Sequence, residues 1–149
     1  MQVTQKCQYA LRAVFELAKR AGQGPVKIAE IADVQAIPPR FLEVILSQLK
    51  QAGFVESQRG RDGGYVLVRP AAELTVGDVM RFMQGPIGPV DCVLKQQNCK
   101  CPLYGGCVFL PMWQRAQRAM SAVYDTTTFD DLMSDETAAG EGYKPCYSI

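Results

Sequence analysis

Histidine is absent from this chain of 149 residues. Its absence removes the commonest metal ligand in proteins and the usual general base of enzymes. Zinc fingers that combine Cys with His are excluded, and so are nucleophilic triads built on a His base. Any metal must therefore be held by thiolates, helped at most by a carboxylate or an amide. No catalytic constellation is visible, so we predict that the protein is not an enzyme.

Long apolar runs are also missing. The amino-terminal residues contain no apolar stretch of the length that a signal peptide needs, and no later stretch is long enough to cross a bilayer. We therefore expect a cytoplasmic protein without a membrane-spanning segment. Disulfides are rare in that reducing compartment, so the six cysteines favour metal or redox chemistry over a disulfide framework.

A strong net charge is the third absence, because the formal value is only +1. Its distribution is uneven. Residues 1–70 contain ten Lys and Arg against six Asp and Glu, whereas residues 71–149 contain six against nine. A basic first half and an acidic second half are consistent with one end that faces DNA and another that faces a protein partner.

Helical spacing of apolar residues predicts helices at residues 4–19, 26–33 and 39–51. In the second helix, Ile28, Ala29 and Ile31 should face inward. The third begins at a proline, which suits a first helical turn, and ends before Gly53. Its buried side is predicted to consist of Phe41, Leu42, Ile45, Leu46 and Leu49.

The opposite side of the third helix gathers Arg40, Glu43 and Ser47. Two short helices joined by a tight turn, the second with a polar outer side, indicate a helix-turn-helix. We expect the second of them to enter the major groove of DNA. There Arg40 would pair with guanine, Glu43 would accept a hydrogen bond from cytosine N4, and Ser47 would contact a base edge or a phosphate.

Two short β-strands, at residues 54–58 and 65–69, are predicted directly after this pair of helices. The loop between them is rich in glycine, as a tight hairpin turn requires. A hairpin in this place is typical of the wing of a winged helix. Arg59 and Arg61 at its tip are expected to enter the minor groove or to clamp phosphates, although loop arginines can also be merely solvated.

The wing is expected to be followed by a fourth helix that begins near Leu74. Thr75 is its predicted N-cap and Asp78 the acid of a capping box. Val79, Phe82 and Met83 should pack this helix against the first.

A long amphipathic helix is predicted after Cys107. Trp113, Ala116, Met120 and Val123 recur there at spacings of three and four, which indicates a seam for a symmetry mate. Packing of this stripe on its own domain is the alternative. A short acidic turn or helix should follow at residues 126–133, and the chain from Ser134 onward is expected to be loosely ordered, with no clear role for Cys146.

Four cysteines lie within sixteen residues, in the pattern C-x6-C-x-C-x5-C: Cys92, Cys99, Cys101 and Cys107. Thiolates on one loop are readily gathered around a metal centre, and Cys107 precedes a helix whose amino-terminal dipole favours the thiolate. The paired Cys-x-x-Cys knuckles of a zinc ribbon are absent. An iron–sulfur cluster is favoured, with structural zinc and metal-free thiols or disulfides as alternatives. Cys7, on the apolar side of the first helix, is either a buried core residue or a ligand.

Several motifs together resemble the winged-helix regulator family that includes IscR, NsrR, RirA and CymR, over residues 1–135. They comprise Tyr-Ala-Leu-Arg at 9–12, Phe-Leu-Glu at 41–43, Arg-Gly and Gly-Gly-Tyr in the wing at 59–65, and Cys101-x5-Cys107 shortly before Trp113.

That resemblance implies a homodimer whose subunits each carry a cluster, [2Fe-2S] favoured over [4Fe-4S], and whose affinity for a palindromic promoter site changes with cluster state. The family's three cysteines correspond to Cys92, Cys101 and Cys107. Gln8 stands where some relatives have an acidic ligand, so the fourth ligand is open: Cys99 from the same loop, or Cys7 of the partner subunit.

The predicted fold is therefore mainly α with a small β-hairpin: a winged helix-turn-helix domain at 1–84, a cysteine-rich loop at 85–107, a dimerisation helix with a short terminal helix at 108–135, and a flexible tail at 136–149. The predicted function is a DNA-binding regulator that senses cluster status, iron, or redox or nitrosative stress. A metal-free regulator that senses thiols or a partner protein is one alternative. An iron–sulfur electron carrier is the alternative of another class.

Overall fold

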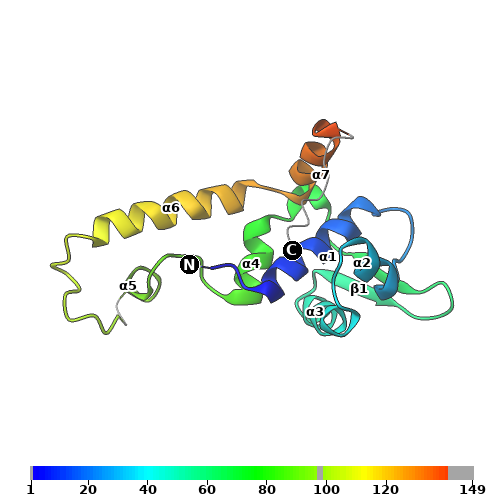
Figure 1. Cartoon of the computed structure of the whole chain (residues 1–149), viewed down its shortest axis with the longest axis horizontal. Helices are drawn as coiled ribbons and strands as arrows, with labels where there is room; N and C mark the ends of the chain where they lie inside the picture. The colour runs from blue at the N-terminus through cyan, green and yellow to red at the C-terminus, as the bar shows by residue number, and fades with distance from the viewer. Residues whose placement is uncertain (1, 97–98, 141–149) are drawn as a thin grey trace.

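The computed structural model describes residues 2–96 and 99–140, and it has two parts (Figure 1). One is a compact helical domain with a two-stranded hairpin. The other is a long helix that projects from this domain and has the cysteine loop at its far end. The order of elements in the compact domain is α1 (Gln5–Lys19), α2 (Ile28–Val34), α3 (Pro39–Gln51), β1 (Val55–Gln58), β2 (Gly64–Leu67), η1 (Ala71–Glu73) and α4 (Val76–Gln84). After it come α5 (Asp91–Leu94), α6 (Leu110–Thr126) and α7 (Phe129–Ala138).

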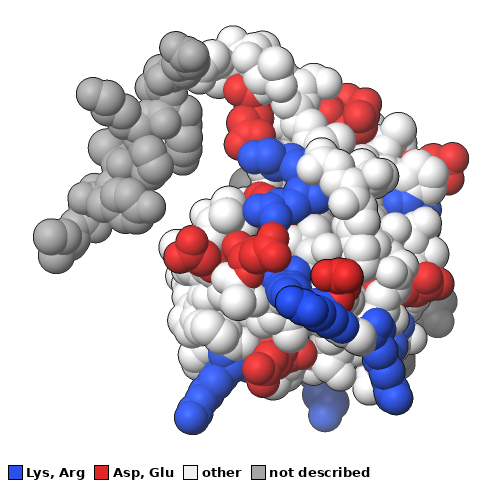
Figure 2. All heavy atoms as spheres, turned by 90° about the vertical axis from the view of Figure 1, so that its right-hand side faces the viewer, with Lys and Arg blue, Asp and Glu red and all other residues white. Residues whose placement is uncertain are grey.

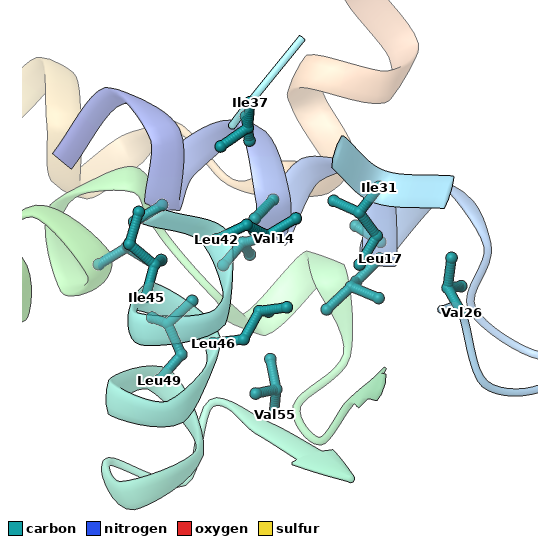
Figure 3. Packing of buried hydrophobic residues seen from close by; sticks show 14 of the residues in the cluster. Val14, Leu17, Val26, Ile31, Ile37, Leu42, Ile45, Leu46, Leu49 and Val55 are labelled. Carbon is teal, nitrogen blue, oxygen red and sulfur yellow. The ribbon is translucent and has the colours of Figure 1, made fainter. Parts of the chain in front are cut away.

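The core lies where α1 crosses α2, α3 and β1. Figure 3 shows side chains from these elements pointing toward one another, and those of α3 are at most 1% exposed. Burial of this many aliphatic side chains is the main force that holds the domain together. The labelled members are Val14, Leu17, Val26, Ile31, Ile37, Leu42, Ile45, Leu46, Leu49 and Val55.

Local signals placed most helix ends correctly. Thr4 caps α1 through a hydrogen bond from the backbone N–H of Cys7, and α3 has the predicted bounds. Thr75 and Asp78 form the predicted capping box at the start of α4. The predicted mainly α fold with a β-hairpin is thereby confirmed.

Other expectations were wrong. The helix α2 begins at Ile28 because Val26 instead forms a β-bridge with Tyr65 beside the wing. Ala29 is exposed. Phe41 was predicted to be buried but is 63% exposed, because α1 covers only one edge of the apolar side of α3. The ring of Phe82 does not lie in the core; it is 43% exposed and lies 5.5 Å from that of Phe54.

The carboxyl-terminal part also differs from expectation. The helix α7 continues to Ala138, so residues 134–138 are helical instead of loosely ordered. Phe129, at its start, is fully buried in the core of the compact domain, and this burial holds the helix in place. Cys146 lies outside the described residues.

The long helix α6 is attached at its carboxyl-terminal end. Met120 and Tyr124 pack on a small buried cluster between α1 and α4, and Arg81 of α4 forms an ion pair with Asp125. None of the residues of α6 is fully buried. Figure 1 shows its other end extending away from the compact domain toward α5. None of the described helices is long and apolar enough to cross a membrane.

Candidate functional site

The outer side of α3 carries the polar residues predicted to read DNA. Arg40, Glu43 and Ser47 are all exposed. Their position follows from the opposite side of the same helix, which is sealed in the core. Within residues 2–96 and 99–140, neither Arg40 nor Glu43 forms an ion pair, so both charges are available to a ligand.

The wing follows α3 directly. Its strands pair antiparallel, with Val55 opposite Leu67 and Gln58 opposite Gly64. The Nζ of Lys50, near the end of α3, donates a hydrogen bond to Ser57 Oγ at 2.6 Å and links helix to wing. Arg59 and Arg61 on the loop are exposed and have no ion pair among the described residues.

The face that carries the hairpin shows Lys and Arg side chains projecting between scattered Asp and Glu side chains (Figure 2). Cations in this arrangement suit phosphate contact, while the interspersed carboxylates disfavour indiscriminate attraction of any polyanion. Although the net charge of the chain is only +1, the face that carries the hairpin has projecting cations of the kind that contact phosphates.

A polar network between α1 and the helix-turn-helix was not predicted from the sequence. Glu16 is only 3% exposed, yet both carboxylate oxygens are satisfied. Its Oε1 accepts from Arg20 Nε at 2.8 Å and its Oε2 accepts from Gln35 Nε2 at 2.9 Å. Arg12 Nη1 donates to the carbonyl of Gln35 at 2.7 Å, and Arg20 also pairs with Glu30. The hydrogen bond from Arg20 to Glu16 is the largest cause of the raised pKa of Arg20.

This network fixes the turn between α2 and α3, because Gln35 is the first turn residue. Charged residues at helical spacing on α1 were the only signal in the sequence, and they could not reveal a partner across the fold. The turn contains Ala36 at φ 50°, a left-handed conformation that is strained for any residue with a side chain.

The cysteine segment begins on the short helix α5 and ends beside α6. Cys92, Cys99 and Cys107 are partly exposed, and Cys101 is exposed. The backbone N–H of Cys101 donates to Cys99 Sγ at 3.4 Å. Leu110 N donates to the carbonyl of Cys107 at 3.2 Å, which places this cysteine directly before α6.

The surroundings of Cys92 disfavour its thiolate. Loss of hydration raises the pKa of Cys92, and the negative charges of Cys99, Cys101 and Cys107 raise it further. A cation would relieve this repulsion. In the described part of the chain, however, no three Cys, Asp or Glu side chains form a group that could hold a metal ion as they stand. The four sulfurs share one segment but are not assembled into a ligand set.

Cys7 is the exception among the described cysteines. It is fully buried between α1 and α4, in a cluster with Val76, Met80 and Ile87. Burial raises the pKa of its thiol, which disfavours the thiolate that a metal needs. The core interpretation of Cys7 is therefore confirmed, and a role as a ligand to a partner subunit would require it to leave this cluster.

Comparisons with known proteins agree with this arrangement. A family model for Rrf2, described as "Iron-dependent Transcriptional regulator", matches residues 3–135. The chain belongs to the Rrf2 family.

Rrf2 relatives match over almost the whole chain. The HTH-type transcriptional regulator CymR of Bacillus subtilis is 36% identical, over 96% of this chain and 97% of its own length. IscR of Serratia proteamaculans is 30% identical, over 91% of this chain and 81% of its own length. Both relatives are named transcriptional regulators, which agrees with the prediction that this protein is not an enzyme.

Solved structures confirm the winged-helix fold of this Rrf2 protein. The structure of CymR, described as the global cysteine regulator of B. subtilis, superimposes with a TM-score of 0.76 at 34% identity, covering 90% of this chain and 97% of that one. T. potens IscR superimposes with a TM-score of 0.74 at 29% identity, covering 99% and 97%. The chain is therefore a helix-turn-helix transcriptional regulator.

Proposed function

We propose that this Rrf2 protein is a dimeric, cytoplasmic regulator that binds palindromic promoter DNA and changes its affinity with the state of an iron–sulfur cluster. The observation that carries the proposal is the segment from Cys92 to Cys107, which gathers four cysteines at the end of a helix that leads back to the DNA-binding domain.

The proposed ligands are Cys92, Cys101 and Cys107, with Cys99 as the fourth. Thiolates are the donors that iron–sulfur clusters take, and the chain has no histidine that could replace one of them. When bound, an iron–sulfur cluster would supply a redox centre that gains or loses electrons. The cluster itself can also be lost under stress. Binding would draw together sulfurs that now stand apart, and would thereby change the shape of the loop beside α6.

The long helix α6 is the proposed dimerisation element and the route from the loop to the DNA-binding domain. Of the predicted stripe, Val123 is 60% exposed, Trp113 and Ala116 are partly exposed, and Met120 packs on its own domain. Met112, outside that stripe, is 45% exposed. Such exposed apolar surface on one helix suits a symmetry mate. At its carboxyl-terminal end, the ion pair between Asp125 and Arg81 connects α6 to α4 and hence to α1.

DNA binding is proposed to use α3 in the major groove and the wing arginines on phosphates or in the minor groove. Two such modules in a dimer would match two half-sites. Arg59→Ala should weaken binding to all sequences and lower the salt slope by about one. Glu43→Ala should instead relax sequence preference, and an unchanged preference would contradict the proposed role of this carboxylate.

A second candidate is a metal-free regulator that responds through its thiols or through a partner protein. The similarity to CymR, described as a global cysteine regulator, favours it, as do the exposure of Cys101 and the partial exposure of Cys92, Cys99 and Cys107.

The deciding experiment is purification without oxygen, followed by visible absorption and by iron and sulfide analysis. A coloured protein with matched iron and sulfide would support the cluster. Serine substitutions at Cys92, Cys101 and Cys107 should then remove the colour, and Cys99→Ser tests the fourth ligand. Cys7→Ser is the matched control, because that thiol is buried away from the loop. A colourless protein with reactive thiols would contradict the cluster and support the second candidate.

A further inference from the structure

An apolar side chain stands in the middle of the polar side of α3. Val44 is 54% exposed, although it lies on the helix that would read DNA. It is one turn beyond Arg40 and one turn before Ser47, and directly follows Glu43. All three of these polar residues are exposed, so Val44 shares their outward face.

The core offers no place for this side chain. On the inner side of α3, Leu42, Ile45, Leu46 and Leu49 are at most 1% exposed, so that side is already filled. Single exposed valines are common on protein surfaces and need no explanation. Val44 differs because Phe41, 63% exposed, lies close by, and both line a groove of about 590 Å³ between α1 and α3.

Exposed positive charges on α1, α3 and the wing favour a polyanion as the occupant of this groove. Arg40 on α3 and Arg59 and Arg61 on the wing have no ion pair among the described residues. Lys6 lines the groove itself. DNA displays one apolar group in its major groove, the C5-methyl of thymine, and alanine, threonine and aromatic side chains are known to contact it.

We propose that Val44 is a specificity-determining residue that packs against a thymine methyl group. The proposal rests on the proposed placement of α3 in the major groove. Glu43 precedes Val44 directly, so the two side chains would contact neighbouring base pairs. A carboxylate selects cytosine by accepting from N4, and an isopropyl group selects thymine by covering its methyl. Together, Glu43 and Val44 would read two adjacent base pairs, one by a hydrogen bond and the other by an apolar contact.

The test begins by selecting preferred sites for the full-length protein from a random-sequence duplex library. Each thymine of the selected site is then replaced, one at a time, by deoxyuridine, which lacks only the methyl. We expect one replacement per half-site to weaken binding about fourfold, the value for removing one buried methyl-sized group. Val44→Ala should respond less than the parent protein to that same replacement, because the shorter side chain loses most of its contact with the methyl.

Two further variants sharpen the test. Val44→Gln should move the selected base at that position from thymine to adenine, since a glutamine amide pairs with adenine N6 and N7. Val68→Ala is the matched control: this valine is 45% exposed and lies just beyond the wing strand β2, outside α3. It should keep the full response to deoxyuridine.

The outcomes separate the two proposals. Binding without any sequence preference, or no binding, would overturn both the reading of DNA by α3 and the role of Val44. Clear preference with no effect of deoxyuridine would overturn the role of Val44 alone. A change of oligomeric state in Val44→Ala, with thymine preference retained, would likewise overturn it and assign the groove to a second copy of the chain.

Discussion

Val26 and Tyr65 exchange a pair of backbone hydrogen bonds, from Val26 N to Tyr65 O at 2.9 Å and from Tyr65 N to Val26 O at 2.8 Å. The chain that enters α2 thus runs antiparallel to the wing strand β2 and meets it in one β-bridge. This pairing joins the first helix of the helix-turn-helix to the wing. Because α2 also packs against α3, this pairing helps to hold the wing and α3, the two parts proposed to contact DNA, in place relative to one another.

Gly64 should be intolerant of substitution for this reason. A Cβ at this position would overlap the backbone of Val26, and backbone cannot move aside cheaply. Gly64→Ala is expected to lower the free energy of unfolding by about 1–3 kcal/mol, as overpacking does. Urea denaturation measures the change. Gly106→Ala is the control, because a Cβ there meets nothing within 4 Å; equal losses in both variants would contradict the explanation.

Glu16 should be important for stability although it is charged and buried. Replacement by alanine leaves Arg20 without its main partner and Gln35 without an acceptor. We expect Glu16→Ala to cost about 2–3 kcal/mol of unfolding free energy, in the range for breaking buried polar networks. Glu30→Ala removes a half-exposed partner of the same arginine and should cost less than about 1 kcal/mol. Thermal or chemical denaturation of both variants measures these losses. Equal losses would show that the buried network around Glu16 adds nothing beyond a surface ion pair.

Ala36→Gly is expected to stabilise the protein. The left-handed conformation at φ 50° costs a residue with a Cβ about 1–2 kcal/mol, and glycine adopts it freely. Part of that gain is lost to the greater freedom of glycine in the unfolded chain, so a net gain of about 0.5–1 kcal/mol is expected. Ala29→Gly, on an exposed position of α2, should destabilise by about 1 kcal/mol. Denaturant midpoints that move in the same direction would refute the strain at Ala36.

The ion pair between Asp125 and Arg81 should make stability depend on pH. Its hydrogen bonds to Arg81 hold the pKa of Asp125 below the ordinary value. A lowered folded pKa gives stability that is fully present above the unfolded value, about 3.9, and is lost as the pH falls through the folded pKa. Asp125→Asn should therefore be less stable than the parent at pH 6 and converge with it in acid.

Denaturation midpoints across this pH range measure the difference. Asp62→Asn on the wing loop is the control, because Asp62 has no ion pair within residues 2–96 and 99–140. A constant gap between parent and Asp125→Asn from pH 6 into acid would show that the loss does not come from this ion pair.

The proposed dimer should depend on the exposed apolar residues of α6. Met112→Glu places a charge among these exposed residues and is expected to shift the protein from dimer to monomer in analytical ultracentrifugation. Val68→Glu, at an exposed apolar position of the DNA-binding domain, should leave the mass unchanged. A parent protein that sediments as a monomer would remove the basis for the dimer.

The sequence by itself determined what depends on near neighbours along the chain. Helix α3 begins at Pro39 and ends before Gly53, and the capping box joins Thr75 to Asp78 across one turn, so their signals lie within a few residues. The fold followed, because a helical pair and a hairpin in this order leave little choice of architecture.

Only the tertiary structure decided what depends on partners distant in sequence. Phe41 has the spacing of a core residue but is exposed, because coverage of that edge depends on where α1 lies. Three further features could be seen only in the folded protein. They are the hydrogen bond from Gln35 to Glu16, the β-bridge between Val26 and Tyr65, and the exposure of Val44 beside an apolar groove. Periodicity reports which residues share a side of a helix, whereas burial is decided by the surface that packs against that side.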